Sequence, residues 1–389
     1  MAERLSNIGY LGIKKETTKG VAVTPNVYIP LYDETFMTDV ALDLDNPIVG
    51  NKADIFQTVQ GQRVHSGEVT ILAEPNTAGY ILDMFMTKGT TTGAGPYTHP
   101  FTISPTTDPK SYTVDIQKGQ LVTRFVGCEI SEVGIDFDTN KMVFKLKFAA
   151  LSSFIVREIS GVNTNVVTFK TNYDPTPTTG LVASDLVRIY DVSAGTFQDF
   201  TISSLTGTTA TLSGSPTGIV SGDLFFLRAA TPSYTLRNPF MWAKTEFRFG
   251  ADASTALSAT QTRLEKGSKF TLQHMFMTDD GEQRSGAFDP AALVRTQSHA
   301  EVEVKRFFDN PDDMNLFLTN QKRAVVIRMY SEDTTYELRV TINNLRWQEN
   351  PTNLKSGEVV YSEGKLVGVY DTSDGQQFDV KVLNNVSSI

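Results

Sequence analysis

The chain of 389 residues contains few of the residues on which metal and redox chemistry depend. Its single cysteine, Cys128, excludes an intrachain disulfide, and the apolar segment around it is typical of a small buried thiol. The four histidines, at positions 65, 99, 274 and 299, do not have the close spacing of zinc ligands, and CxxC and HExxH motifs are missing. We therefore expect no metal and no cofactor.

Signatures of common enzyme classes are also missing. The chain has no GxSxG nucleophile motif, no GxxxxGK[ST] phosphate loop and no GxGxxG dinucleotide fingerprint. Because the residues of a catalytic triad can be scattered along a chain, these absences disfavour an enzyme without excluding one. The acidic cluster Asp43, Asp45 and Asn46 lacks the loop pattern of a calcium site, so we assign no metal to it.

Long apolar runs are absent as well. No stretch approaches the roughly 18 to 20 consecutive apolar residues of a membrane-spanning helix, and the first residues lack the pattern of a secretion signal. The composition, with 40% hydrophobic and 20% charged residues, is that of a globular protein. The formal net charge is −9, from 35 Lys+Arg and 44 Asp+Glu. The length suffices for two or three domains.

Short runs of alternating apolar and polar residues predict a mainly β protein. The clearest run is Lys141 to Phe148, in which three lysines alternate with Met, Phe and Leu. Similar runs are found at residues 27–31, 67–73, 112–116, 130–137, 269–275, 301–307, 324–330 and 336–342. Two helices are predicted, one after Pro75 that ends near Gly89, and one that begins with Asn310 as N-cap and Pro311 as first residue.

The order strand, long loop, strand, helix, strand, strand occurs twice along the chain. The segment Phe36 to Asp39, with the sequence FMTD, recurs as Phe276 to Asp279, and we expect each to end a strand before a long loop. Beyond the loops, His65 to Val69 resembles Ser298 to Val302. Four such landmarks in one order predict an internal duplication, so we interpret residues 1–153 and 233–389 as two β-sandwich or barrel units, each flanked by a helix.

Residues 154–232 differ in amino-acid composition from both flanking parts. They are rich in Thr, Ser and Gly, and they contain short strand patterns at residues 166–169, 186–190, 197–202, 208–212 and 223–228. These patterns predict a small β-barrel or sandwich inserted between the two units.

The N-terminal part resembles a known family. The segment Leu11 to Pro25, followed by Ile29 to Leu31, resembles the start of tail tube proteins of long, non-contractile-tailed bacteriophages. The later strand with Ser66 to Val69 and the helix near Tyr80 fit the same family. The resemblance is strongest over residues 9 to 150 and weaker over residues 235 to 389, and it does not cover the middle insert.

The resemblance implies a structural virion protein, made in the host bacterial cytoplasm, whose inner sheets join between subunits around a lumen. Stacked rings of such subunits form the tail tube through which the genome is ejected. Chains with two tube units form trimeric rings with pseudo-sixfold symmetry, and hexameric rings are the alternative. The implied partners are the tape-measure, tail terminator and distal tail proteins, with double-stranded DNA passing through the lumen without specific binding. The insert is expected on the tube exterior.

The net negative charge of the chain is compatible with such a conduit. We expect an acidic inner wall to repel phosphate and let DNA slide, although a negative charge also simply keeps a protein dispersed in solution. The basic strand face of Lys141, Lys145 and Lys147 is interpreted as a solvated or ion-pairing face rather than a DNA track. An alternative function is a carbohydrate-binding or adhesin-like β protein, in which Trp242 and Trp347 provide stacking platforms.

Two predicted long loops, Val40 to Val64 and Asp280 to Gln297, carry the candidate assembly contacts. Loops of this length are usually functional or disordered, and apolar residues in them need a surface to cover them, either on a neighbouring subunit or on the core of their own chain. We expect these residues to contact neighbouring subunits or rings: Leu42, Leu44, Ile48, Val49, Ile55, Phe56, Phe288, Leu293 and Val294.

Overall fold

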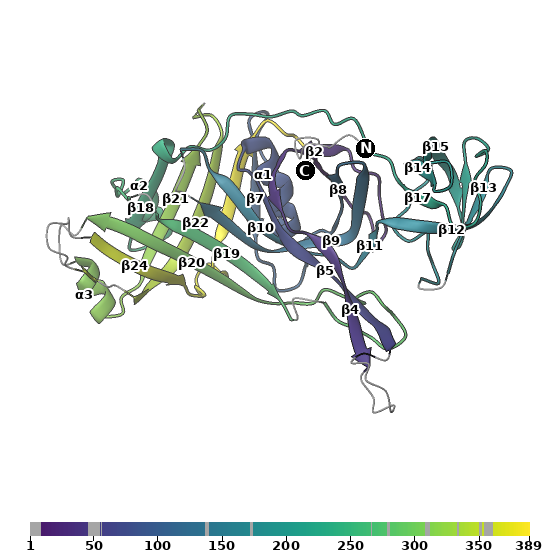
Figure 1. The fold of residues 1–389 in the computed structure, drawn as a ribbon. Helices are drawn as coiled ribbons and strands as arrows, with labels where there is room; N and C mark the ends of the chain where they lie inside the picture. The colour runs from purple at the N-terminus through teal and green to yellow at the C-terminus, as the bar shows by residue number, and fades with distance from the viewer. Residues whose placement is uncertain are drawn as a thin grey trace.

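A computed structural model describes residues 9–45, 55, 57–136, 140–171, 174–265, 267–277, 281–307, 312–332, 334–349, 352–353 and 361–389. Strands make up most of the described secondary structure, so the prediction of a mainly β protein is confirmed. Figure 1 shows a long sheet, a thin projection below it and a small β unit beside it.

Among the described residues, eight strands form one continuous antiparallel sheet. Each neighbouring pair in the order that follows is hydrogen-bonded. The order is β4 (Met37–Asp45), β5 (Gln57–Leu72), β10 (Val143–Ala149), β9 (Leu121–Asp136), β19 (Lys269–Phe276), β20 (Arg295–Phe307), β24 (Tyr361–Gly368) and β22 (Glu337–Glu349). The pair β9 and β19 joins the first half of the chain to the second.

A second layer covers one face of this sheet. In the first half, β2 (Val27–Ile29), β1 (Leu11–Lys15), β8 (Tyr112–Lys118) and the first part of β9 are paired in that order. In the second half, β18 (Thr245–Gly250) pairs with β21 (Arg323–Tyr330), which pairs with β22. Next to the first parts of β9 and β22 lie β11 (Ser152–Phe154) and β25 (Asp379–Asn384), respectively.

Strand β9 belongs to both layers, because it bends in the middle. Gly127 stands at the bend with a φ of +69°, and a Cβ there would lie 2.8 Å from Leu151. Only glycine avoids both the left-handed strain and this contact. The neighbouring Cys128 is buried, as its apolar context predicts, and burial raises the pKa of its thiol.

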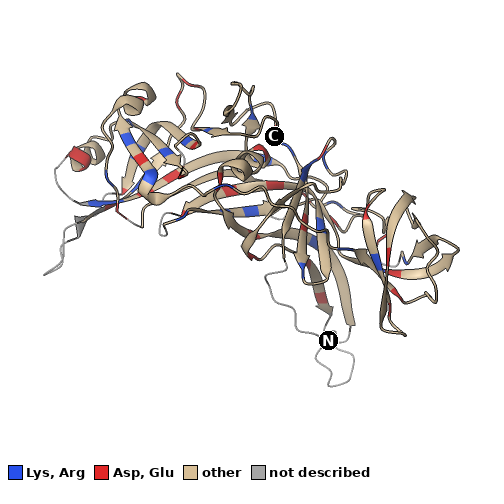
Figure 2. Ribbon diagram, turned by 90° about the horizontal axis from the view of Figure 1, so that it is seen from above, with Lys and Arg blue, Asp and Glu red and all other residues tan. Residues whose placement is uncertain are grey.

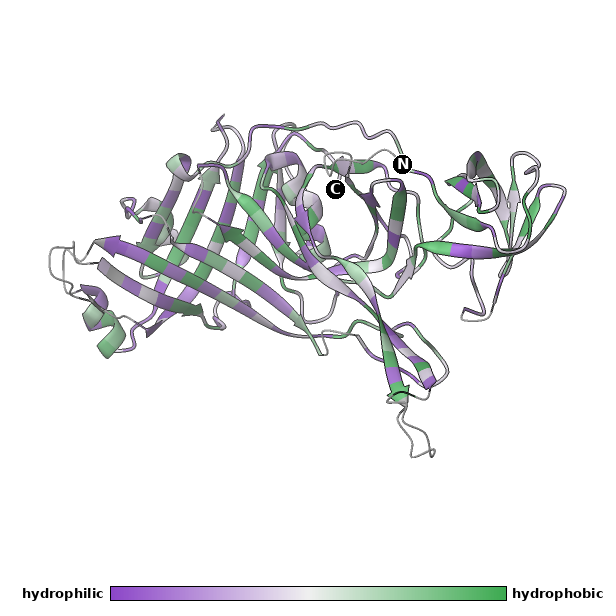
Figure 3. Ribbon diagram, in the orientation of Figure 1, coloured by the Kyte–Doolittle hydropathy of each residue, from purple (hydrophilic) through white to green (hydrophobic). Residues whose placement is uncertain are grey.

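The main hydrophobic core lies between the two layers. Alternate side chains of the long sheet, such as Phe144 and Leu272, pack there with side chains of the outer layer such as Ile13 and Ile327. The regular alternation of hydrophobic and hydrophilic positions along the strands is visible in Figure 3. Residues on the other face of the long sheet meet solvent, which is the pattern of an antiparallel sheet with one wet side.

Each half of the chain contains one of the two predicted helices. The predicted first helix is confirmed as α1 (Pro75–Phe85), whose N-terminus is capped by the side chain of Glu74 and which ends at Met86 rather than at Gly89. The second is α3 (Asp312–Leu318), while the predicted Asn310 cap and Pro311 lie outside the described residues. The short helices α2 (Ala253–Ser258) and η2 (Trp242–Lys244) were not predicted.

The two halves are interlocked. Strand β7 (Tyr97–Thr102), which pairs with β6 (Thr87–Lys88), lies in the first half of the sequence but pairs with β25 near the end of the chain. Between them His99 is buried, with its Nε2 atom 3.1 Å from Asn384 Oδ1. The final strand therefore holds a segment of the first half in place.

Residues between the halves form a small β unit with its own core. Its strands are β12 (Val156–Asn163), β13 (Val166–Phe169), β14 (Leu186–Asp191), β15 (Thr196–Leu205), β16 (Thr209–Leu212) and β17 (Leu224–Leu227). Side chains such as Ile159, Val187 and Phe225 pack together in a cluster separate from the main core. The unit is joined to the rest through β17, where Leu227 pairs with Val122 of β9.

Two expectations were wrong. Residues 40–64 do not form a long loop, because β4 and β5 extend into the segment as a hairpin. The alternation of Leu42 and Leu44 with aspartates is the strand pattern that marks it. The two FMTD segments are also not equivalent, because Met37 begins a strand opposite Ser66 whereas Phe276 ends one opposite Arg295.

Candidate assembly surfaces

A projecting hairpin carries several exposed apolar side chains. We name it the arm and define it as β4 together with Ile55 and residues 57–64 (Figure 1). Isolated two-stranded ribbons are marginally stable in water, and apolar residues on them mark a surface that a partner covers. The exposed apolar side chains here, with their exposed fractions, are Met37 (55%), Leu42 (61%), Leu44 (59%), Ile55 (47%) and Val59 (52%).

The base of the arm is fastened by residues 281–294, which come from the second half. The backbone N–H of Arg63 donates to the carbonyl of Phe288 at 2.7 Å, and the Arg63 guanidinium lies over the Phe288 ring, 5.5 Å from its centre. Gln283 Nε2 donates to the carbonyl of Arg63 at 3.1 Å. The arm is therefore held at its base by the second half of the chain.

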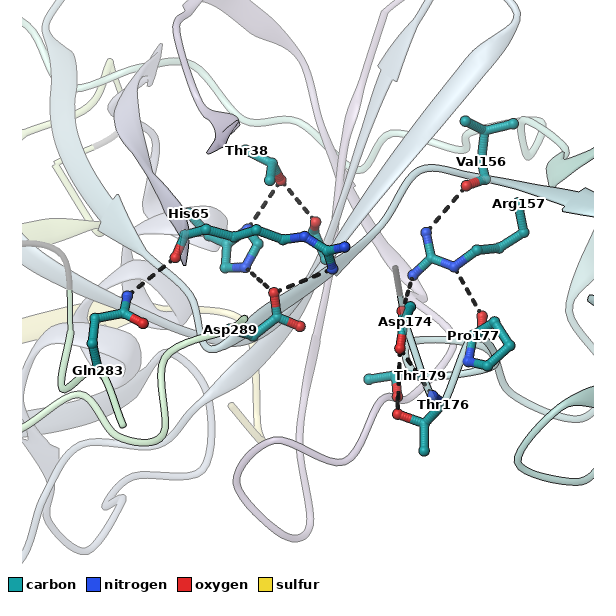
Figure 4. Close-up of polar contacts among 12 residues, drawn as sticks. Thr38, His65, Val156, Arg157, Asp174, Thr176, Pro177, Thr179, Gln283 and Asp289 are labelled. Carbon is teal, nitrogen blue, oxygen red and sulfur yellow. Dashed lines mark hydrogen bonds and ion pairs between the residues drawn. The ribbon is translucent and has the colours of Figure 1, made fainter. Parts of the chain in front are cut away.

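A polar cluster reinforces this base (Figure 4). His65 lies between Thr38 and Asp289, with ring nitrogens 3.0 Å from Thr38 Oγ1 and 3.2 Å from Asp289 Oδ1. Burial alone would raise the pKa of Asp289, but the hydrogen bond to His65 and the positive charges of Arg63 and Arg157 lower it below its usual value. Asp289 is therefore ionised at neutral pH and fixes the direction of the arm.

The structure divides the predicted contact residues into three groups. Leu42, Leu44 and Ile55 are exposed on the arm, and Phe288 (37%) and Val294 (41%) are exposed beside it. Leu293 is not available to a neighbour, because it is 4% exposed and packs with Ala149 and Phe276 of its own chain. Ile48, Val49 and Phe56 lie outside the described residues.

The two edges of the long sheet form a second candidate surface. Within the described residues, β4 pairs only with β5, and residues 346–349 of β22 pair only with β24. Both edges therefore present backbone groups without a strand partner, which makes each a template for another strand. Because all the pairings are antiparallel, β4 and β22 run in opposite directions, as two strands must to pair antiparallel with one another.

The joint between β9 and β19 shows how two strands of this sheet pair between the two halves of the chain. Glu132 lies opposite Gln273, and Asp136 lies opposite Lys269, in a regular antiparallel ladder. No sequence pattern indicated this joint, because periodicity shows which face of a strand is buried and not which strand it meets.

A buried ion-pair network fastens the small β unit to the main body. Arg124, 2% exposed, contacts both carboxylate oxygens of Asp115, at 2.7 and 2.9 Å, and Asp185 of the small unit at 2.5 Å. Burial alone would lower the pKa of Arg124, but the two carboxylates raise it further than burial lowers it. Thr24 donates a further hydrogen bond to Asp185 at 2.8 Å.

The tryptophans do not form a binding platform. Trp242 and Trp347 both pack against the main core, and Trp242 lies 6.1 Å from the Phe247 ring. Trp347 closes over Gly364, where a Cβ would lie 2.3 Å from its ring. These contacts remove the feature that favoured a carbohydrate-binding function. In the described part of the chain, no cluster of metal-ligating side chains is found and no helix is long and apolar enough to cross a membrane.

Comparison with known families identifies a family for this chain. The profile of the family described as phage tail tube protein matches residues 6–225, more than half of the chain. The match continues through most of the inserted β unit, which the resemblance noted from the sequence did not cover. A comparison with curated proteins gives no match.

Proposed function

The chain belongs to the phage tail tube protein family and is a structural component of the virion tail, and from this premise we propose that three copies close each ring of the tube and that the arm stacks the rings. Each copy contributes two tube units, residues 1–153 and 233–389, with residues 154–232 on the exterior. The role is mechanical and not enzymatic. The observation that carries the proposal is the repeated strand order of the long sheet.

The repetition supports two equivalent units. The order β4, β5, β10, β9 is followed by β19, β20, β24, β22, and within its own set each strand of the first set has the same neighbours as its counterpart in the second. In the outer layer, β1 and β8 correspond to β18 and β21. Helices α1 and α3 each follow the second strand of a set.

The registers of the two sets also agree. In the first set Val69 pairs with Leu146 and Gly67 with Phe148. In the second set Val302 pairs with Leu366. Ala300, two positions earlier on β20, lies beside Gly368, because a Cβ atom added to Gly368 would be 3.0 Å from the Cβ of Ala300. The resemblance of His65 to Val69 with Ser298 to Val302 therefore coincides with equal positions in the sheet, although the FMTD match does not.

The internal joint supplies a template for the joint between subunits. Strand β9 ends the first set and pairs with β19, the first strand of the second set. By the same rule, β22 pairs with β4 of the next copy. The neighbours of Glu132 in the first set correspond to those of Arg346 in the second, so these two residues occupy equivalent positions. In the same way, Gln273 of the second set is equivalent to Met37 of the first. Arg346 is therefore placed opposite Met37 of the neighbouring copy.

Ring size follows from the strand count. Three copies of the eight described strands form a barrel of 24 strands. With a strand spacing of about 4.8 Å and a tilt of about 40°, this barrel has a backbone diameter of about 48 Å. Side chains occupy about 5 Å on each side and leave a lumen of about 38 Å, which admits double-stranded DNA. Six copies would close a barrel of about twice this diameter.

Electron microscopy of the purified protein in negative stain tests the proposal. We expect stacked rings or tubes with an open centre and, in views along the axis, three exterior densities from the inserted units. A carbohydrate-binding or adhesin-like protein would remain as discrete particles without rings. Addition of the tape-measure protein is the appropriate second condition, because a partner of this kind is expected to set tube length and to start assembly. Discrete monomers under both conditions would contradict the proposal.

A further inference from the structure

Five lysines lie on the solvent-facing side of the long sheet, which we name the wet face. The wet face comprises the side chains of β10, β9, β19, β20 and β24 that alternate with core positions such as Leu146, Leu272 and Leu366. Under the proposed function this face lines the lumen. Unpaired lysines along a DNA path would bind phosphate and release counterions, and DNA would adhere to the wall.

Every one of these five lysines contacts a carboxylate on a neighbouring strand, with an Nζ to oxygen distance of 3.0 Å or less. Figure 2 shows blue and red segments next to one another along the sheet. The pairs are Lys145 with Asp136 (2.8 Å), Lys147 with Glu132 (3.0 Å), Lys269 with Glu303 (3.0 Å), Lys365 with Glu301 (2.7 Å) and Lys305 with Glu363 (2.6 Å).

The pairs form a continuous band that crosses the internal joint. Glu132 of β9 accepts hydrogen bonds from Lys147 on one side and from Gln273 of β19 on the other. Further along, Glu301 pairs with both His299 and Lys365. The band therefore includes both units of the chain, and a strand that carries lysines, such as β10, lies beside a strand that supplies carboxylates, such as β9.

The pKa shifts of Glu301 and Lys365 agree with this pairing. Burial alone would raise the pKa of Glu301, but the hydrogen bonds and charges of Lys365 and His299 lower it below its usual value. In turn, the hydrogen bond to Glu301 raises the pKa of Lys365. Both groups are thus charged at neutral pH.

We propose that cross-strand ion pairing keeps the tube wall from binding duplex DNA, because each lysine is already neutralised by a carboxylate fixed beside it. This proposal rests on the proposed function, which makes the wet face the lumen. A phosphate that approaches Lys147 or Lys365 must displace a carboxylate that is tethered at high local concentration and that repels it. Under this proposal the wall carries alternating, locally balanced charges, and not the acidic inner wall expected from the sequence.

The test uses tubes of the variant Glu132→Gln with Glu301→Gln. The substitutions preserve side-chain shape and remove the carboxylates that lie within 3.0 Å of Lys147 and Lys365. Because solvent-exposed ion pairs of this kind contribute little to stability, the fold survives. The probe is a short fluorescent DNA duplex that is sedimented together with the tubes. At about 50 mM salt we expect at least tenfold more retained duplex than with wild-type tubes, and this excess disappears near 200 mM salt.

Two control variants separate the wall from the rest of the protein. Glu158→Gln with Asp199→Asn makes the same change in net charge on the inserted unit, where it leaves Lys170 and Arg188 without those partners, and it is expected to retain far less duplex. Adding Lys147→Gln and Lys365→Gln to the first variant restores the wild-type net charge and is expected to abolish retention.

Three outcomes overturn the inference. The first is that variant tubes form but retain no more duplex than the exterior control, which leaves the proposed function intact. The second is that wild-type tubes themselves retain duplex. The third is that retention persists after the two lysines are removed, because the freed lysines are then not the binding groups. Failure of the wild-type protein to form any tube is a separate result, since it counts against the proposed function itself.

Discussion

Single rings without tubes are the expected product of changing Leu42 and Leu44 together to serine. Both side chains lie on the arm, and their exposed fractions are 61% and 59%. Full burial of a leucine is worth about 1.5 to 3 kcal/mol, so the two residues contribute several kcal/mol per arm to stacking. With three arms per ring, loss of this contribution lowers the affinity between rings by several orders of magnitude. Sedimentation and negative-stain images of the variant measure the effect.

A matched control distinguishes stacking from general loss of apolar surface. Val192 and Val220 are similarly exposed, at 52% and 55%, but lie on the inserted unit. Changing both to serine is expected to leave tube length unchanged. The arm is not the stacking element if the Leu42 and Leu44 variant still forms full-length tubes of normal stability.

Changing Arg124 to leucine is expected to cause the largest loss of stability. The substitution leaves Asp115 and Asp185 buried without their cation, and removal of one partner from a buried ion pair typically costs about 3 to 5 kcal/mol. The free energy of unfolding, measured by denaturant titration at pH 7, gives the magnitude. Arg188 to leucine is the control, because its pair with Asp199 is partly exposed and contributes at most about 1 kcal/mol.

The pH dependence of this loss identifies its cause. Burial already raises the pKa of Asp115 in the wild-type protein, and without Arg124 nothing opposes that effect. A carboxyl whose pKa is raised in the folded state favours folding below its unfolded pKa of about 3.9, and that advantage is lost as the pH rises. The Arg124 to leucine variant should therefore be less destabilised at pH 4 than at pH 7. An equal loss at both pH values would point to a packing defect instead.

Local patterns were sufficient to predict many of the individual elements. The alternation from Lys141 to Phe148 predicted β10, and the spacing after Pro75 predicted α1. The strand patterns of the inserted segment are found as β13 to β17. In each case the information lies in a few consecutive residues whose period indicates which face is buried.

The arrangement of these elements could not be predicted in the same way. Glu132 and Gln273 are 141 positions apart, and nothing in either strand specifies the other as its partner. The arm was missed because its strands are exposed on both faces and lack a buried stripe. Leu293 was assigned to an interface because it is apolar and lies in a loop, whereas its own chain covers it.

Net charge is a poor guide to the wet face. A total of −9 says nothing about where opposite charges stand beside one another. The pairs Lys145 with Asp136 and Lys269 with Glu303 depend on which strands are neighbours, and thus on the fold. Their function, if the lumen test succeeds, is a property of the sheet and not of the composition.

Closure of three copies through β22 and β4 is the central claim, and a disulfide tests it directly. Residues directly opposite in an antiparallel ladder have Cβ atoms about 4.5 to 5.5 Å apart, close to the separation that a disulfide requires. The variant Met37→Cys with Arg346→Cys places one cysteine on each edge, and the native Cys128 is buried and does not interfere. Glu132→Cys with Gln273→Cys is the control, because these residues face one another within a single chain.

The products are read on a denaturing gel without reductant, after oxidation of assembled tubes. The control is expected to give an intrachain bond and to run as a monomer. For Met37→Cys with Arg346→Cys, we predict dimers and trimers in a ladder that ends at three, since the third bond closes the ring. Monomers alone, or a ladder that continues beyond three, would contradict the account.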